Sequence, residues 1–138
     1  MIKARSVFHI GIPVNDMERA VKFYAEVLGM KVALRDRDDM GDVLDRADLR
    51  CEDGSMVVLF QRPKPIDEDS TMYAGATHQA FMVDNDDFDL ALEKMREWGV
   101  RIHNVPMVDR GPQGRGFYFF DTEGNLLQLY APPRLTAA

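Results

Sequence analysis

The fold of this chain is decided by the stretch VFHIGIPV at residues 7–14 and by the helical pattern directly after it. Alternate positions of this stretch are apolar, which is typical of a strand with one buried face: Phe8, Ile10, Ile12 and Val14. His9 then points to the opposite face of the same strand. The stretch therefore predicts a half-buried strand that presents one imidazole.

A helix is expected directly after this strand. Asn15 and Asp16 are favourable N-cap residues, and apolar side chains recur at helical spacing from Met17 to Leu28. Gly29 is a typical helix stop, and residues 30–34 are expected to form a second strand.

The same order of features returns in the second half of the chain. Residues 77–83, THQAFMV, read as a strand that carries His78, and residues 84–87 read as a turn and cap. A helical stripe from Phe88 to Trp98 comes next, and Gly99 ends it. Residues 53–60 and 123–130 both look like a tight turn followed by a strand. Such matched order indicates an internal duplication.

The duplication predicts an α+β fold in which each half has the order β-α-β-β-β. We place module one at residues 5–60, a proline-containing linker at 61–76 and module two at 77–132, within a single domain. The charged segment 36–48 is expected to be a loop.

Composition excludes several classes of function. The formal net charge is −6, which argues against a nucleic-acid surface, and no apolar run is long enough to span a membrane. The single cysteine, Cys51, rules out an internal disulfide, and the first residues lack the apolar core of a signal peptide. A cytoplasmic protein is therefore expected.

The two strand histidines are the candidate metal ligands. His9 and His78 occupy equivalent positions of the repeat, each on the face opposite the apolar one. In the last strand Gln128 is the polar side chain that shares a face with Leu126 and Tyr130. Two imidazoles and one oxygen donor leave open positions on a divalent ion. The alternative is that all three side chains merely form structural hydrogen bonds.

These residues carry a resemblance to a known family. The chain resembles the vicinal-oxygen-chelate superfamily of glyoxalases, bleomycin-resistance proteins and extradiol dioxygenases over about residues 5–132. The motifs are FHIGIPV at 8–14, FY-x-x-VLG at 23–29 and GFYFFDTEGNLLQL at 116–129. The resemblance implies two modules forming a cup-shaped, eight-stranded mixed sheet with helices on the outside. It implies a homodimer, and it assigns the metal ligands to His9, His78 and Gln128.

The sequence departs from the family pattern at several positions. Gln128 replaces the commonest ligand, Glu, and an amide is a weaker donor to a hard cation and cannot act as a base. Val58 occupies the position of a further glyoxalase ligand, and residues 109–115 lack the second-sphere histidine of ring-cleaving dioxygenases.

Three further residues are candidates for contact with a substrate. Tyr118 is expected to donate a hydrogen bond to a substrate oxygen, or else to fill the sheet face. Arg115 and Arg110 lie in a glycine-rich segment and are expected to clamp an anionic substrate, unless they are uninvolved surface residues. His103 has no repeat partner and reads as structural or exposed.

The resulting hypothesis is an enzyme that uses Fe(II), Mn(II) or Zn(II) to act on a small oxygen-rich substrate. Dioxygenase-like and glyoxalase-like lyase or isomerase reactions both remain open. The competing hypothesis is a non-catalytic antibiotic-sequestering protein of the bleomycin-resistance type, and a degenerate scaffold is a third possibility.

Overall fold

The structure is a computed structural model that describes residues 1–36, 46–61, 78–109 and 114–133. The chain forms two compact units, Met1–Pro65 and Ile66–Ala138. The boundary between them lies inside the range 61–76 that the sequence predicts as a linker. Among the described residues, each unit contains one helix and one four-stranded sheet.

The first unit has the predicted order of elements. Its sheet has the strand order β1-β4-β3-β2, in which β1 and β4 are parallel and the other neighbours are antiparallel. The elements are β1 (His9–Val14), α1 (Met17–Glu26), β2 (Lys31–Asp36), β3 (Arg46–Arg50) and β4 (Met56–Gln61).

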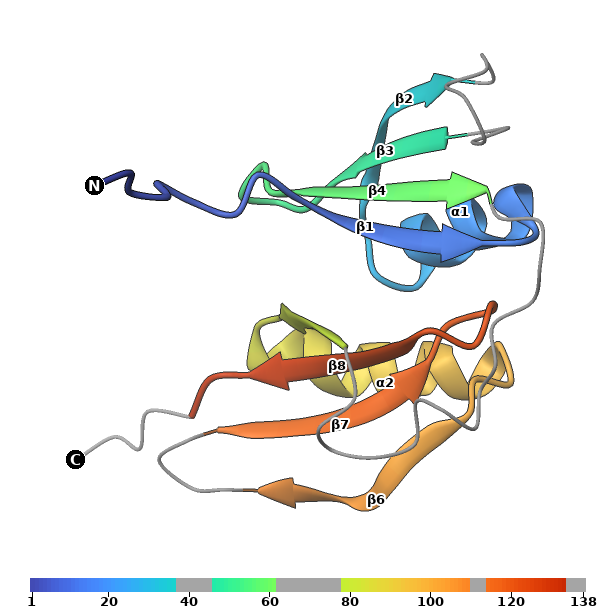
Figure 1. The fold of residues 1–138 in the computed structure, drawn as a ribbon. Coiled ribbons are helices and arrows are strands. Elements are labelled where there is room, and N and C mark those ends of the chain that lie inside the picture. The colour runs from blue at the N-terminus through green and yellow to red at the C-terminus, as the bar shows by residue number, and fades with distance from the viewer. Residues whose placement is uncertain (37–45, 62–77, 110–113, 134–138) are drawn as a thin grey trace. The chain divides into compact units, whose positions relative to one another are not determined.

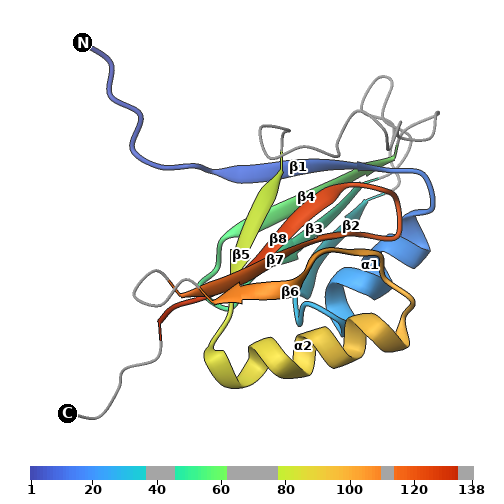
Figure 2. The ribbon, with the colours of Figure 1, turned by 90° about the horizontal axis from the view of Figure 1, so that it is seen from below.

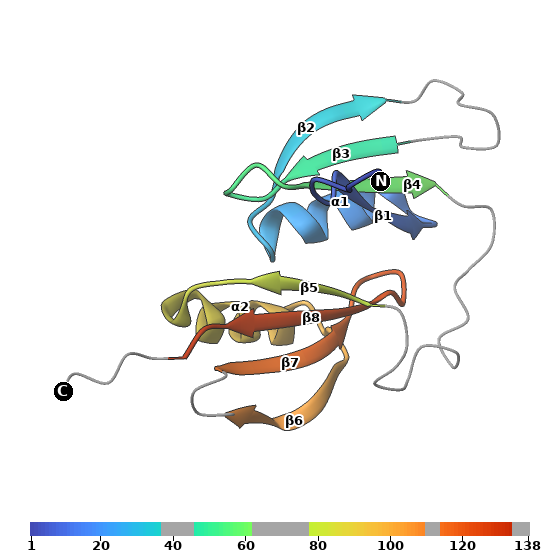
Figure 3. The same ribbon diagram turned by 60° about the vertical axis from the view of Figure 1, so that its left-hand side comes forward.

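The second unit repeats this topology. Its sheet has the order β5-β8-β7-β6, with β5 and β8 parallel and the other neighbours antiparallel, as Figure 3 shows. The elements are β5 (Gln79–Met82), α2 (Asn85–Glu97), β6 (Ile102–Asp109), β7 (Arg115–Phe120) and β8 (Leu126–Ala131).

The α+β class and the two βαβββ modules are confirmed. The eight strands in the described part of the chain divide equally between two mixed sheets, and each helix comes after the first strand of its unit (Figure 1). Within the described ranges, neither helix is long and apolar enough to cross a membrane.

The core of the first unit lies between α1 and one face of its sheet. The apolar stripe of α1 buries Met17, Ala20, Phe23 and Tyr24. Ile12 and Val14 of β1 are also buried, so this face of β1 is the apolar one that the sequence predicts. The predicted cap is present as well, because the Asp16 carboxylate accepts a hydrogen bond from the Arg19 amide at 3.1 Å.

The core of the second unit is more aromatic. Phe88 of α2 meets Phe117 of β7 edge to face, with ring centroids 5.3 Å apart. Figure 2 shows α2 running along one side of the β5–β8 sheet. Other large buried side chains on this side include Leu92, Met95, Phe119, Leu127 and Leu129. Burying each of these large side chains contributes about 1.5–3 kcal/mol, so they fix which face of the sheet meets the helix.

Gly29 and Gly99 act as the predicted helix stops. Both have positive φ angles, 67° and 69°, which a residue with a Cβ atom rarely adopts. The helices therefore end at equivalent points of the two repeats.

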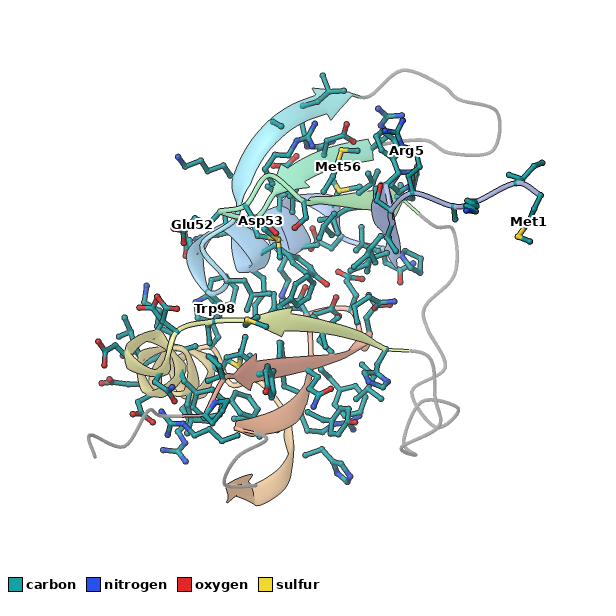
Figure 4. All side chains as sticks on the ribbon, turned by 90° about the vertical axis from the view of Figure 1, so that its left-hand side faces the viewer. Met1, Arg5, Glu52, Asp53, Met56 and Trp98 are labelled. Carbon is teal, nitrogen blue, oxygen red and sulfur yellow. The ribbon has the colours of Figure 1, made fainter. Side chains whose placement is uncertain are left out.

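Two sequence-based expectations need correction. Alternation places Phe8 on the buried face of the first strand, but the strand begins at His9 and Phe8 is 77% exposed. Figure 4 shows Met1 and Arg5 on the extended stretch that precedes it. The expected loop 36–48 is also partly strand, because Asp36 ends β2 and Arg46–Arg50 forms β3; residues 37–45 lie outside the described part.

β3 is hard to recognise in the sequence because three of its five residues are charged. Ala47 and Leu49 are fully buried, whereas Arg46, Asp48 and Arg50 point to the other face. A half-buried strand needs only its inward positions to be apolar, so a run rich in Arg and Asp is compatible with one.

Candidate functional site

The face of the second sheet that points away from α2 carries most of the candidate residues; we call it the α2-distal face. Phe117, Phe119, Leu127 and Leu129 face the helix side and are buried. Because side chains alternate along a strand, Tyr118 of β7 and Gln128 of β8 point the other way. Both are half-buried.

Strand register places these residues in one row across the sheet. Tyr118 lies directly opposite Gln128, and Gln128 lies directly opposite Ala80 of β5. Directly opposed side chains on one face have Cβ atoms about 4.5–5.5 Å apart. Tyr118 and Gln128 are therefore side-chain neighbours, as a shared site requires.

His78 immediately precedes β5 and is the next candidate residue on this face. It lies two residues before Ala80 and so is expected on the same face. Its ring meets the Tyr118 ring edge to face, with centroids 5.1 Å apart. Tyr118 thus contacts His78 and faces Gln128, and it packs against a buried apolar pair, Phe120 and Leu126.

Gly116 leaves room for the Gln128 side chain. A Cβ atom at Gly116 would lie 3.4 Å from Nε2 of Gln128, so this side chain extends over the glycine. The oxygen and nitrogen of such an amide are interchangeable by rotation, so either can face a ligand. Gln128 is therefore held between β7 and β8 with its amide on the α2-distal face.

His9 occupies the equivalent position in the first unit. It is exposed, and Ile12 and Val14 of the same strand point to the opposite, buried side. Its ring contacts that of Phe8, with centroids 5.3 Å apart. The sequence-based expectation that His9 avoids the helix-packed face agrees with this placement.

The first unit does not repeat the polar row of the second. Val58 pairs with Gly11 and with Asp48, where the second unit has Gln128 between Ala80 and Tyr118. Asp48 forms a two-pronged ion pair with Arg46, with nitrogen-to-oxygen distances of 3.1 and 3.3 Å. The Asp48 carboxylate, which lies on the face of the first sheet opposite Ala47 and Leu49, is therefore already bound by the Arg46 guanidinium.

Arg115 lies on the other face of the second sheet, away from Tyr118 and Gln128. Its guanidinium donates to Asp89 at 3.1 Å and to Asn85, both on α2, and stacks over the Phe88 ring at 4.3 Å. These contacts join β7 to α2. They argue against the substrate-binding role expected for Arg115, whereas Arg110 lies outside the described residues.

Two residues on the α2-distal face have no role assigned from the sequence. His103 of β6 lies directly opposite Tyr118. The Arg101 guanidinium lies 4.0 Å from the centre of the Phe120 ring. Arg101 and His103 are two positions apart, so the sequence indicates that they share one face of a strand. It does not reveal which face of the sheet this is.

No three His, Cys, Asp or Glu side chains gather in the described part of the chain. The proposed ligand set does not depend on such a cluster. Gln128 is an amide, and His9 belongs to the other unit.

Comparison with known proteins agrees with the fold. The model of the Glyoxalase/Bleomycin resistance protein/Dioxygenase superfamily matches residues 6–129. A glutathione transferase FosA of Serratia marcescens is 28% identical over 127 residues, which cover 91% of this chain and 80% of that protein.

Solved structures have the same fold. A glyoxalase/dioxygenase of Nostoc punctiforme superposes with a TM-score of 0.75 at 27% identity, covering 97% of this chain and 98% of that one. A variant of the fosfomycin resistance protein FosX of Listeria monocytogenes, complexed with Mn(II) and 1S,2S-dihydroxypropylphosphonic acid, gives a TM-score of 0.72 at 18% identity, covering 94% and 92%. With its matched family model and duplicated βαβββ topology, this chain belongs to the glyoxalase, bleomycin resistance protein and dioxygenase superfamily.

Proposed function

We propose that this chain is a metal-dependent enzyme that acts on a small substrate bearing two vicinal oxygens. The observation that carries the proposal is that Tyr118 contacts the His78 ring and lies directly opposite Gln128 on the α2-distal face. His78 supplies an imidazole and Gln128 an amide oxygen, and His9 is the third ligand predicted from the repeat. This donor set suits Mn(II), Fe(II) or Zn(II).

The bound ion would supply Lewis acidity to substrate oxygens. The residues of the chain would orient the substrate and stabilise charge. Tyr118 has a hydroxyl that can donate a hydrogen bond to an oxygen that gains negative charge, and its ring is fixed by His78, Phe120 and Leu126. Gln128 carries no proton to exchange, so proton transfer would fall to other groups.

The relatives suggest a first substrate to test. One is named a glutathione transferase FosA, and another is a fosfomycin resistance protein with Mn(II) and a dihydroxy phosphonate. We therefore propose that binding of small vicinal oxygen compounds of this kind be measured first. Dioxygenase and isomerase reactions are the next assays.

The decisive experiment measures metal in the full chain purified without a chelating resin. We expect about one divalent ion per chain, and its loss in His78→Ala, because removing one of three ligands weakens an open site strongly. Gln128→Ala is expected to weaken binding as well. Gln79→Ala is the matched control, because Gln79 neighbours His78 but belongs to the opposite face of β5.

A second function, ligand sequestration without chemistry, is favoured by the neutral Gln128 at the position where the family's carboxylate is common. Absence of metal in the purified chain, with no rise in melting temperature on adding Mn(II), Fe(II) or Zn(II), would favour sequestration. The expected homodimer remains a prediction, which sedimentation equilibrium of the full chain would test.

A further inference from the structure

The α2-distal face carries two nitrogen-rich side chains at its β6 edge, Arg101 and His103. Ile102 pairs with Phe119, and His103 pairs with Tyr118. The amide of Phe120 donates to the carbonyl of Arg101 at 3.0 Å, so the pairing continues to Arg101. Arg101 and His103 therefore lie opposite Phe120 and Tyr118 respectively, on one face of the sheet.

Direct contact confirms the face on which Arg101 lies. Its guanidinium carbon is 4.0 Å from the centre of the Phe120 ring. Phe120 and Leu126 form the buried pair against which Tyr118 packs. Arg101 and His103 themselves are exposed, so a solute can reach both.

The side chain of Arg101 brings its charge toward the middle of the sheet. It starts on β6, but the guanidinium rests over a ring of β7. Phe120 pairs with Leu126, so Gln128 lies one strand across from this ring, about 4.8 Å, and two residues along β8, about 7 Å. A molecule of only a few carbon atoms can therefore approach both the Arg101 guanidinium and the Gln128 amide.

Arg101 also has the geometry that favours an anion. A guanidinium stacked on a ring keeps its N–H groups at the rim of the stack, where they can donate in pairs to a carboxylate or phosphonate. His103 adds an imidazole donor next to Tyr118. Arg115, the expected anion clamp, is bound to α2 on the other face.

We propose that Arg101 and His103 form a subsite for the negatively charged end of the substrate. The subsite deepens the proposed function and rests on it, because it shares the α2-distal face with His78, Tyr118 and Gln128. It commits the substrate class to small anions, such as phosphonates or carboxylates, that also bear two vicinal oxygens. Arg101 and His103 would set specificity and orientation, whereas Tyr118 and Gln128 contact the reacting end.

The test compares two probes by isothermal titration calorimetry on the full chain, with and without Mn(II). One probe is 1S,2S-dihydroxypropylphosphonic acid, and the other is propane-1,2-diol, which has the two hydroxyls but no charge. We expect the phosphonate to bind the wild-type chain at least about tenfold more tightly, since hydrogen bonds between charged groups are the strong ones.

Variants then assign the effect to this subsite. Arg101→Gln and His103→Gln should each lower phosphonate affinity by about fivefold or more, with diol affinity unchanged, whereas Arg101→Lys should retain part of it. Arg96→Gln is the matched control, because it removes the same charge from an exposed position on α2. Circular dichroism and melting curves establish that each variant is folded.

The outcomes separate this inference from the proposed function. Equal affinity for the two probes, no binding of either, or an equal loss in Arg96→Gln overturns the subsite. If the wild-type chain binds no Mn(II), the proposed function fails, and the titrations without metal decide the subsite alone. In those titrations without metal, a loss of phosphonate affinity in Arg101→Gln but not in Arg96→Gln still supports the subsite. An unchanged phosphonate affinity in Arg101→Gln overturns it.

Discussion

The ring of His78 stands edge-on to the ring of Tyr118, with centroids 5.1 Å apart and planes inclined by 77°. This arrangement joins the residue before β5 to β7 across the intervening strand β8. Edge-to-face ring pairs are worth about 0.5–1.5 kcal/mol beyond the area they bury. The contact therefore favours this orientation of the two rings.

The Tyr118 hydroxyl and the Tyr118 ring should have separable roles. Tyr118→Phe keeps the packing against His78, Phe120 and Leu126, so we expect an unchanged melting temperature and unchanged metal content. Loss of the hydroxyl should lower affinity for the dihydroxy phosphonate by about three- to tenfold, the worth of one hydrogen bond. Calorimetry and metal analysis measure both quantities.

Removing the ring should instead affect stability. Tyr118→Ala should lower the free energy of unfolding by about 1–3 kcal/mol, because the ring is half-buried in a packed cluster. Denaturant unfolding of both variants provides the comparison. Equal stability of the Phe and Ala variants would mean that the ring contributes no packing.

Gln128→Glu should strengthen metal binding. A carboxylate is a charged, hard oxygen donor, whereas the amide of Gln128 is neutral, so we expect the Kd for Mn(II) to fall by about tenfold or more. Leu90→Glu is the control, because it adds the same charge at an exposed position of α2. A similar change in both variants would indicate a general effect of charge, and no change in either would argue against Gln128 as a ligand.

Arg115→Gln should destabilise the second unit without altering metal binding. Its guanidinium bonds to Asn85 and Asp89 and stacks on Phe88, with the side chain 16% exposed. The ion pair with exposed Asp89 is worth little, but the bonds to Asn85 and the stacking add to it, so a loss of about 1–2 kcal/mol is expected. Arg96→Gln should leave the free energy of unfolding unchanged within error. A folded Arg115→Gln variant with weakened affinity for the dihydroxy phosphonate would instead support the substrate-binding role expected from the sequence.

Asp53 should contribute to the fall in the protein's stability at acid pH. The Ser55 hydroxyl and then the Ser55 amide donate to its carboxylate, at 2.6 and 2.9 Å, and they lower the pKa of Asp53 from the ordinary value of 3.8. Figure 4 shows Asp53 beside Glu52 at this turn. A carboxyl whose pKa is lower in the folded state stabilises the fold above its ordinary pKa and loses this effect as the pH falls through the lowered one.

Asp53→Asn should therefore lower the melting temperature at neutral pH, and the difference from the wild type should shrink as the pH drops below about 4. Thermal unfolding measured across the acid range tests this. Glu52→Gln, the neighbouring exposed carboxyl, serves as the control. A difference between Asp53→Asn and the wild type that stays constant with pH would contradict the linkage.

The sequence by itself determined the repeat and therefore the order of helix and strands in each unit. The apolar stripes of α1 and α2, the cap at Asp16 and the stops at Gly29 and Gly99 are local signals, set by helical spacing and by backbone conformations open to few residues. The shared face of Tyr118 and Gln128 results from alternation about buried neighbours in two adjacent strands.

The tertiary structure alone decided which strands lie side by side and in which register. Arg115 and Arg101 look alike in sequence, but one bonds to Asp89 of α2 and the other rests on Phe120 of the opposite face. His103 meets Tyr118 only because β6 pairs with β7 in one register, and a slip by a single residue would turn it to the other face. Register depends on packing between segments distant in the chain, which local pattern does not encode.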